Sequence, residues 1–95
     1  MQKKIIIVTA EWDYFKEQLS TLCSQLSRAG VDCEVRDYGN PEALRLIVKY
    51  GIDNGMIRIP QIYVISDGNV RRIDYEVTSD LKIIIKDLND YISNE

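Results

Sequence analysis

The feature that most constrains the fold is an unbroken β-branched run, Ile5-Ile6-Ile7-Val8, within residues 4–9. A strand in which apolar and polar residues do not alternate is buried on both faces, and such strands usually lie centrally in a sheet with parallel neighbours. The chain has 95 residues, which is enough for one hydrophobic core and no more. We therefore expect a single α/β domain over residues 1–95, in which residues 4–9 form the middle strand.

A helix and a second strand are predicted after this run. Over residues 14–28 the apolar positions have helical spacing, Asp13 is able to cap the start, and Gly30 suits the end. Residues 31–36 then alternate apolar and charged side chains, as in a half-buried strand. Because a helix separates the two strands, we expect a parallel, right-handed βαβ unit.

The signals for a second helix lie between residues 40 and 51. Asn40 suits the N-cap, Pro41 suits the first turn, and Gly51 suits the position just after the end. The expected apolar stripe of this helix is Leu44, Ile47 and Val48.

After a polar stretch over residues 53–58, we expect an antiparallel hairpin and a last helix. Residues 62–65 and 70–73 have the composition of strands and are joined by the turn sequence Asp67-Gly68. Thr78 or Ser79 is able to cap the final helix, whose apolar stripe consists of Leu81, Ile84, Ile85, Leu88 and Ile92. The predicted order is βαβ-α-ββα, an α/β fold with a four-stranded mixed sheet flanked by three helices.

Charge and composition exclude several classes of function. The formal net charge is −3 and basic residues are isolated or in short pairs, so we expect no nucleic-acid partner. The chain has no histidine, which removes the commonest metal ligand and the commonest general base. No apolar run is long enough to cross a bilayer, and no cleavable leader follows Lys3-Lys4. We expect a cytoplasmic protein that binds neither a metal nor a membrane.

The two cysteines, Cys23 and Cys33, are not closely spaced. Cys23 falls on the apolar stripe of the first helix and Cys33 alternates inward on the second strand, which favours small core residues over reactive thiols. They flank the βαβ crossover, so a regulatory disulfide between them stays open, although a cytosolic setting disfavours it.

Pro60 stands at the start of the third strand and cannot donate a hydrogen bond to a neighbouring strand. We therefore expect Ile59 to keep its backbone N–H and C=O unpaired, as an edge on which another chain is able to dock. Arg58 lies beside this edge and either pairs with a ligand carboxylate or is an ordinary exposed loop arginine.

The sequence Ile59-Pro60-Gln61-Ile62-Tyr63 and the predicted order of elements resemble the thioredoxin superfamily, and its glutaredoxin branch in particular. Residues 49–53 and the Asp67-Gly68 turn are similar to the short thioredoxin or glutaredoxin proteins of large tailed phages. The resemblance covers nearly the whole chain and implies a thioredoxin-like fold with a cis Ile59-Pro60 bond. It also implies that the backbone before the proline pairs with a peptide or with the cysteinyl part of glutathione.

The chain departs from this family at the redox motif. Where the family has Cys-x-x-Cys, the chain reads Trp12-Asp13-Tyr14-Phe15, with Asp13 in the position of the nucleophilic cysteine. Asp13 is either a plain helix cap or a functional carboxylate at a helix start. Trp12 and Tyr14 either contact a ligand or pack over the helix start.

A second match to the family lies at the predicted last helix. There the family uses a Ser/Cys-Asp pair to hold the γ-glutamyl end of glutathione, and Ser79-Asp80 matches this pair. The same two residues also suit an ordinary helix cap. Glu76-Val77-Thr78 replaces the Gly-Gly that glutaredoxins carry at this place, which crowds the cleft for glutathione.

Three functions compete on this basis. The first is a redox-inactive glutaredoxin-like module without catalytic residues, which binds a peptide, a protein partner or glutathione through Trp12, Asp13, Tyr14, Arg58, Ile59, Pro60, Ser79 and Asp80. The second is a thiol-dependent enzyme, either an electron donor working through Cys23 or a transferase-like domain with glutathione as cosubstrate. The third is a scaffold for protein interaction, similar to the clock-type thioredoxin-like proteins around Val70-Arg71-Arg72-Ile73.

Overall fold

A four-stranded mixed sheet forms the centre of the computed structural model, which describes residues 3–86. Its strands are β1 (Lys3–Thr9), β2 (Asp32–Asp37), β5 (Gln61–Ser66) and β6 (Asn69–Ile73), in the order β2-β1-β5-β6. Strand β1 is parallel to β2 and antiparallel to β5, and β5 is antiparallel to β6. The β-branched run therefore lies in an internal strand, as predicted, and the βαβ unit is parallel, as predicted.

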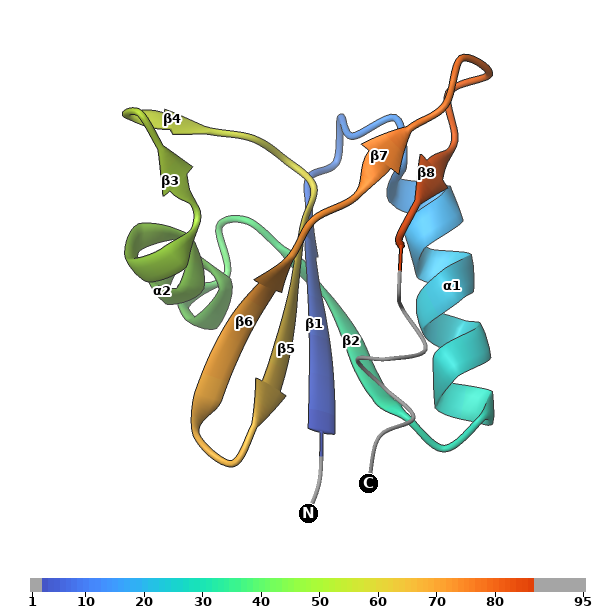
Figure 1. Cartoon of the computed structure of the whole chain (residues 1–95), viewed down its shortest axis with the longest axis horizontal. Helices are drawn as coiled ribbons and strands as arrows, with labels where there is room; N and C mark the ends of the chain where they lie inside the picture. Colours follow the sequence, from blue (N-terminus) through green and yellow to red (C-terminus); the bar gives the residue numbers. More distant parts are fainter. Residues whose placement is uncertain (1–2, 87–95) are drawn as a thin grey trace.

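Two helices lie on opposite faces of this sheet, α1 (Lys16–Arg28) on one and α2 (Pro41–Tyr50) on the other (Figure 1). The alternate residues of β1 divide between the two sides. Those toward α1 join a cluster of Ile5, Ile7, Leu19, Cys23, Leu26, Ile62, Val64, Ile73 and Ile83. Those toward α2 join a cluster of Ile6, Val8, Ala43, Leu46, Ile47 and Tyr63. The sheet is thus the middle of three layers, which explains why β1 has no polar face.

Helix α1 begins later than the sequence predicts. Its N-cap is Phe15, which makes no side-chain capping bond, and the first helical residue is Lys16 rather than Tyr14. The Asp13 carboxylate, three residues before the helix, instead accepts a hydrogen bond from the Phe15 backbone N–H at 3.0 Å. Asp13 therefore closes the turn that leads into α1 and is not the N-cap itself.

Helix α2 begins where predicted but buries a different face. The Asn40 side chain accepts hydrogen bonds from the N–H groups of Glu42 and Ala43, as an N-cap does. The buried residues are Ala43, Leu46 and Ile47, whereas Leu44 and Val48 are 45% and 66% exposed. The predicted stripe was therefore wrong at these two positions. The small Ala43 side chain lets the helix pack on the sheet through the face that carries Ala43, Leu46 and Ile47.

A buried hydrogen-bond network joins the end of α2 to strand β5. The Gln61 side-chain amide donates to the Gly51 carbonyl at 2.9 Å, and the Tyr63 hydroxyl donates to the Gln61 side-chain oxygen. A Cβ at Gly51 would lie 2.2 Å from this oxygen, so the close approach requires glycine. Burial raises the pKa of Tyr63 to about 12, which keeps its hydroxyl a donor.

The predicted polar stretch after α2 contains a short hairpin of β3 (Ile52–Asp53) and β4 (Met56–Ile57). Its turn is Asn54-Gly55, and both residues have positive φ, of 53° and 76°. Asn-Gly is the strongest sequence signal for a two-residue hairpin, so the signal was present in the sequence.

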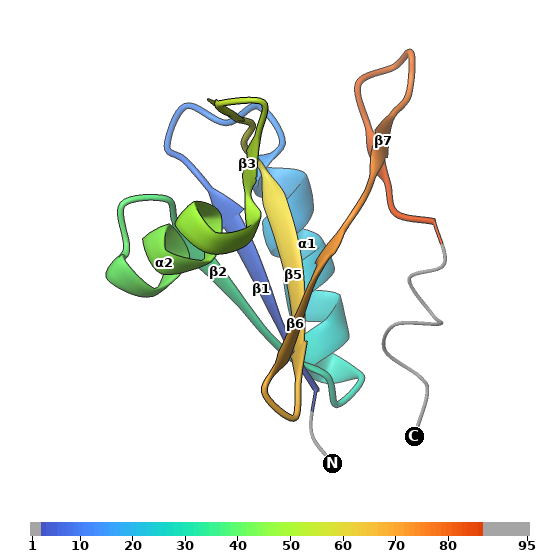
Figure 2. The same ribbon diagram turned by 60° about the vertical axis from the view of Figure 1, so that its left-hand side comes forward.

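A hairpin replaces the predicted last helix as far as residue 86. Strands β7 (Glu76–Val77) and β8 (Ile83–Ile84) are antiparallel and project beyond the end of the sheet (Figure 2). Leu81 has a φ of 62°, which a helix does not allow. The predicted order βαβ-α-ββα with three helices is therefore wrong: residues 3–86 form two helices, the four-stranded sheet and two small hairpins. The predicted stripe positions Leu88 and Ile92 lie outside the described residues.

Gln18 of α1 explains why β8 is extended. Its side-chain amide donates to the Ile83 carbonyl at 3.0 Å, and its oxygen accepts from the Ile83 N–H at 3.1 Å. One side chain thus satisfies both backbone groups of Ile83 as a neighbouring strand does, while the Ile83 side chain enters the core on the α1 side.

The cysteines were predicted as small core residues, but Cys23 and Cys33 form a disulfide with Cα atoms 5.4 Å apart. Cys23 lies on the face of α1 that packs on the sheet, and Cys33 lies on the neighbouring strand β2. Their Cα separation is in the normal range for a disulfide. The bond therefore joins α1 to β2 across the crossover, which the sequence left as an alternative.

No helix within residues 3–86 is long and apolar enough to cross a membrane.

Candidate functional site

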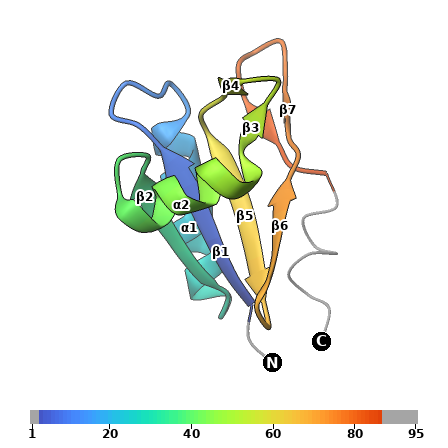
Figure 3. The same ribbon diagram turned by 90° about the vertical axis from the view of Figure 1, so that its left-hand side faces the viewer.

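Most of the predicted site residues gather at one end of the sheet (Figure 3). The loop from β1 to α1 lies there, because β1 ends there. The segment before β5 and the segment after β6 lie there too, because β5 is antiparallel to β1 and β6 is antiparallel to β5. Residues 10–15, 58–60 and 74–75 are therefore neighbours in space although they are far apart in the sequence.

Pro60 is buried at this end of the sheet, immediately before β5. The Ile59-Pro60 bond is cis, as the resemblance implied. Ile59 lies outside both pairings of β5, since these begin at Gln61 and Ile62. Its side chain packs against the core cluster on the α2 side. The position of Ile59 thus agrees with an edge that makes no sheet pairing.

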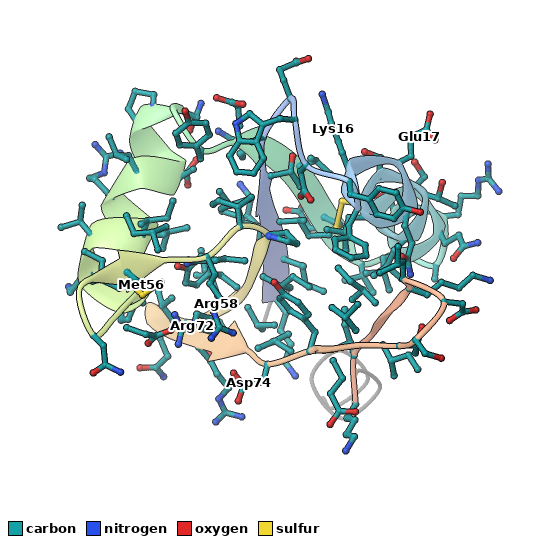
Figure 4. All side chains as sticks on the ribbon, turned by 90° about the horizontal axis from the view of Figure 1, so that it is seen from above. Lys16, Glu17, Met56, Arg58, Arg72 and Asp74 are labelled. Atoms are coloured by element: carbon teal, nitrogen blue, oxygen red, sulfur yellow. A yellow bond between two sulfur atoms is a disulfide. The ribbon has the colours of Figure 1, made fainter. Side chains whose placement is uncertain are left out.

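A pocket of about 120 Å³ lies beside Pro60. Figure 4 shows Arg58 and Arg72 next to each other at this place, with Asp74 further along the chain. The pocket is lined by Asp53, Arg58, Pro60, Gln61, Arg72, Ile73, Asp74 and Tyr75. Its volume suits one small polar group, since a water molecule occupies about 30 Å³ of liquid.

The two arginines of the pocket differ in their partners. Arg72 donates from one nitrogen to both carboxylate oxygens of Asp53, at 2.9 and 3.0 Å. This bond raises the pKa of Arg72. Arg58 is exposed and has neither an ion pair nor a side-chain hydrogen bond with any residue of the described part. The positive charge of Arg72 is therefore balanced by Asp53, whereas Arg58 forms no ion pair within residues 3–86.

Tyr75 fixes the backbone of the pocket. Its hydroxyl donates a hydrogen bond to the Pro60 carbonyl at 2.7 Å. Burial raises the pKa of Tyr75, and the nearby Asp13 carboxylate raises it further. Tyr75 consequently stays protonated at neutral pH and keeps the Pro60 carbonyl engaged.

Asp13 lies behind this pocket as a buried carboxylate. Its side chain is 9% exposed, and Oδ1 accepts the Phe15 N–H. Oδ2 is buried and has no hydrogen-bond partner within residues 3–86. Asp13 acts on Tyr75 through its charge but does not line the pocket.

The other predicted site residues lie apart from the pocket. Trp12 and Tyr14 are 69% and 71% exposed and do not line it. Ser79 and Asp80 lie in the turn between β7 and β8, where the Thr78 hydroxyl donates to the Asp80 carboxylate and lowers the pKa of Asp80. Because no helix begins at residue 79, these two residues do not form the helix-start site that the resemblance implied.

Six of the residues that line the pocket were not predicted from the sequence: Asp53, Gln61, Arg72, Ile73, Asp74 and Tyr75. In the sequence, Arg72 belongs to the run Val70-Arg71-Arg72-Ile73 and Asp53 to the polar stretch over residues 53–58. No local signal joins them, because Asp53 on β3 and Arg72 on β6 meet only through the tertiary fold. Alternation along β6 does place Arg72 on the same face as Val70, toward α2.

The side chains that line the pocket are mainly charged and polar. Within residues 3–86 the pocket offers one guanidinium without an ion pair, that of Arg58, in a lining that also contains Asp74, and no thiol, since Cys23 and Cys33 are joined to each other and do not line it. No group of three or more metal-ligating side chains occurs within residues 3–86. No protein-family model, curated protein or solved structure matches this chain.

Proposed function

We propose that the chain is a binding module that takes an extended segment of a partner protein at the Pro60 pocket, with a carboxylate of that segment on Arg58. The observation that carries the proposal is the difference between the two arginines. Arg72 already holds Asp53, whereas Arg58 has no carboxylate partner among the described residues. A guanidinium beside a small pocket binds a carboxylate with directed N–H groups.

The backbone next to Arg58 supports an extended ligand. Ile59 lies before the first pairs of β5, so its N–H and C=O are outside the sheet pairing. An extended peptide binds such an edge through main-chain hydrogen bonds and gains selectivity from pockets for its side chains. Tyr75 holds the Pro60 carbonyl, so the edge has a fixed conformation before the ligand arrives.

A peptide fits these features better than glutathione does. Arg58 and the Ile59 backbone are available to either ligand, but the predicted γ-glutamyl site at Ser79-Asp80 has become a hairpin turn outside the pocket. The module therefore lacks the second anchor that the family uses for glutathione. Glutathione serves as the small-ligand comparison in the test below.

The test is calorimetric titration with two blocked peptides, Ser-Val-Glu-Val-Ser and its counterpart with Gln in place of Glu. We expect the Glu peptide to bind several-fold more tightly than the Gln peptide or glutathione. Arg58→Gln should weaken binding of the Glu peptide about fivefold and leave the Gln peptide unchanged.

Arg45→Gln is the matched control, because Arg45 is an exposed arginine on α2 that does not line the pocket. It removes the same charge and should leave the affinity for the Glu peptide unchanged. Equal losses of affinity for the Glu peptide in the Arg58 and Arg45 variants would show that the effect comes from net charge and not from the pocket. Equal affinity of the two peptides for the unmodified chain would contradict the proposal and leave the scaffold function.

A further inference from the structure

Two aromatic rings form an exposed pair at the carboxyl ends of β1 and β2. Trp12 and Tyr38 are 69% and 44% exposed, and their ring centroids lie 6.3 Å apart at an interplanar angle of 61°. The Tyr38 N–H donates to the Thr9 carbonyl at 2.9 Å, which extends the pairing of the two strands and holds Tyr38 in place. The pair is thus set on the rigid end of the sheet and yet remains open to solvent.

The charges around this pair are predominantly negative. Glu11 and Asp37 are the chain neighbours of the two rings, both are exposed, and Asp13 follows Trp12. Lys16 is the compensating cation and contacts the Glu11 carboxylate at 3.3 Å. Glu11 is 89% exposed at its side chain, so this ion pair is open to water and contributes little to stability.

The nearest arginine is directed elsewhere. The Arg36 guanidinium pairs with Glu34 and, at 3.1 Å, with Glu42. The cation–π contact found in the described part of the chain is that of Lys49 over Tyr50. No cation–π contact within residues 3–86 involves Trp12 or Tyr38, although an acidic residue adjoins each of them in the sequence, and the Asp37 carboxylate also accepts a hydrogen bond from the Gly39 N–H.

We propose that Glu11, Trp12, Asp37 and Tyr38, here called the Trp12–Tyr38 surface, bind an arginine side chain from a basic segment of a partner protein. Aromatic faces attract cations, and tryptophan does so best. Arginine suits the surface better than lysine because its planar guanidinium stacks on a ring while its N–H groups reach a carboxylate. The same carboxylates repel an acidic peptide or a nucleic-acid phosphate, which leaves a basic partner as the occupant.

This surface goes beyond the proposed function, since it shares no residue with the Pro60 pocket and selects the opposite charge. Either proposal is able to fail without the other. Trp12 is the only tryptophan of the chain, so intrinsic fluorescence reports on this surface directly.

The experiment titrates the whole chain with three blocked peptides, Gly-Arg-Gly-Arg-Gly and its counterparts with Lys or Glu in place of Arg. We expect a saturable change in Trp12 fluorescence with the Arg peptide, a weaker affinity for the Lys peptide and no change with the Glu peptide. The affinity should fall as salt is added, because the contacts are exposed and charged. No change with the Arg peptide, or an equal change with the Glu peptide, would overturn the proposal.

Variants locate the binding. Tyr38→Leu and the double variant Glu11→Gln, Asp37→Asn should each weaken binding of the Arg peptide about threefold to fivefold. Lys16→Gln should strengthen it, because Glu11 loses its competing ammonium. Tyr14→Leu is the control for Tyr38→Leu, since Tyr14 is even more exposed than Tyr38 but pairs with Phe15 instead.

Arg58→Gln separates the two proposals, because it should leave the affinity for the Arg peptide unchanged. A loss with Tyr14→Leu as large as with Tyr38→Leu would show general adsorption to aromatic surface and would overturn the proposal. Circular dichroism spectra that match the unmodified chain establish that each variant is folded.

Discussion

At the residue scale, the lack of a side chain at Gly51 positions Gln61 and, through it, the site. Gly51 lets α2 end against Gln61, and Gln61 is the first residue of the strand that follows Pro60. Gly51→Ala would place a Cβ 2.2 Å from the Gln61 side-chain oxygen and 2.7 Å from the Tyr63 hydroxyl. We expect a loss of about 1 to 3 kcal/mol in the free energy of unfolding, measured by urea titration.

A double-mutant cycle tests the cause of that loss. Gln61→Ala removes two of the three atoms that a Cβ at Gly51 would meet and leaves the Tyr63 hydroxyl, so Gly51→Ala should cost less in the Gln61→Ala background. Additive losses in the double variant would show that the cost comes from some other contact.

Tyr63 predicts a dependence of stability on pH in the alkaline range. Its side chain is fully buried, and burial raises its pKa from the ordinary value of 10.0 to about 12. Ionisation is therefore easier in the unfolded chain, so the contribution is fully present below pH 10 and is lost as the pH rises through 12. The free energy of unfolding should fall with a slope approaching about 1.4 kcal/mol per pH unit in this window.

Denaturant titrations between pH 9 and 12 measure this slope. Tyr63→Phe keeps the ring and removes the ionisable hydroxyl, so its slope should be shallower than that of the unmodified chain. Equal slopes for the two proteins would assign the pH dependence to other groups.

At the element scale, the β7–β8 hairpin and the expected helix predict opposite effects of the same substitution, Leu81→Gly, on stability. Leu81 is 52% exposed and has a φ of 62°, a conformation that glycine adopts without strain. Leu81→Gly should therefore raise the free energy of unfolding by up to about 1 kcal/mol. In a helix the same substitution would lower it by about 1 kcal/mol.

Lys82→Gly serves as the comparison, because Lys82 is exposed and its φ is not positive. It should lower the stability whichever structure is present. A loss with Leu81→Gly similar to that with Lys82→Gly would favour the helix and contradict the hairpin.

The Cys23–Cys33 disulfide, which joins α1 to β2, should stabilise the folded chain. The bond joins residues 10 apart in sequence, and closing a short loop of this kind restricts the unfolded chain. Reduction with a thiol should lower the free energy of unfolding by about 2 to 3 kcal/mol in urea titrations. The double variant Cys23→Ala, Cys33→Ala should be insensitive to the reductant. Identical unfolding midpoints of the unmodified chain with and without reductant would contradict this role.

At the scale of the whole molecule, the two proposed binding surfaces lie at one end of the sheet. The Pro60 pocket offers the Arg58 guanidinium, and the Trp12–Tyr38 surface offers two rings beside Glu11 and Asp37. The two meet near Asp13, whose charge acts on Tyr75 and whose chain neighbour is Trp12. A partner with an acidic and a basic segment would be able to engage both.

The sequence predicted those parts of the fold whose signals are local. The β-branched run from Ile5 to Val8 identified an internal strand, Asn40 identified the start of α2, and Asp67-Gly68 identified the turn of the β5–β6 hairpin. Each of these signals is complete within a few residues. The structure confirms these predictions because no distant residue is needed to produce the predicted strand, helix start or turn.

The sequence failed where a distant residue decides the outcome. Leu81, Ile84 and Ile85 have helical spacing, but Ile83 is held extended by Gln18, which is 65 residues away. Of the residues that line the pocket, only Arg58 and Pro60 were predicted, because Asp53 and Arg72 form their ion pair through the fold alone. The likeness to the thioredoxin superfamily stays a prediction, since it depended in part on the last helix.

Binding at the Pro60 pocket is tested most directly by amide NMR spectra of the chain titrated with the Ser-Val-Glu-Val-Ser peptide. We predict saturable shifts at the amides of Arg58, Ile59 and Tyr75, which disappear in Arg58→Gln and persist in Arg45→Gln. Shifts confined to residues outside the pocket, or shifts that persist unchanged in Arg58→Gln, would contradict the account.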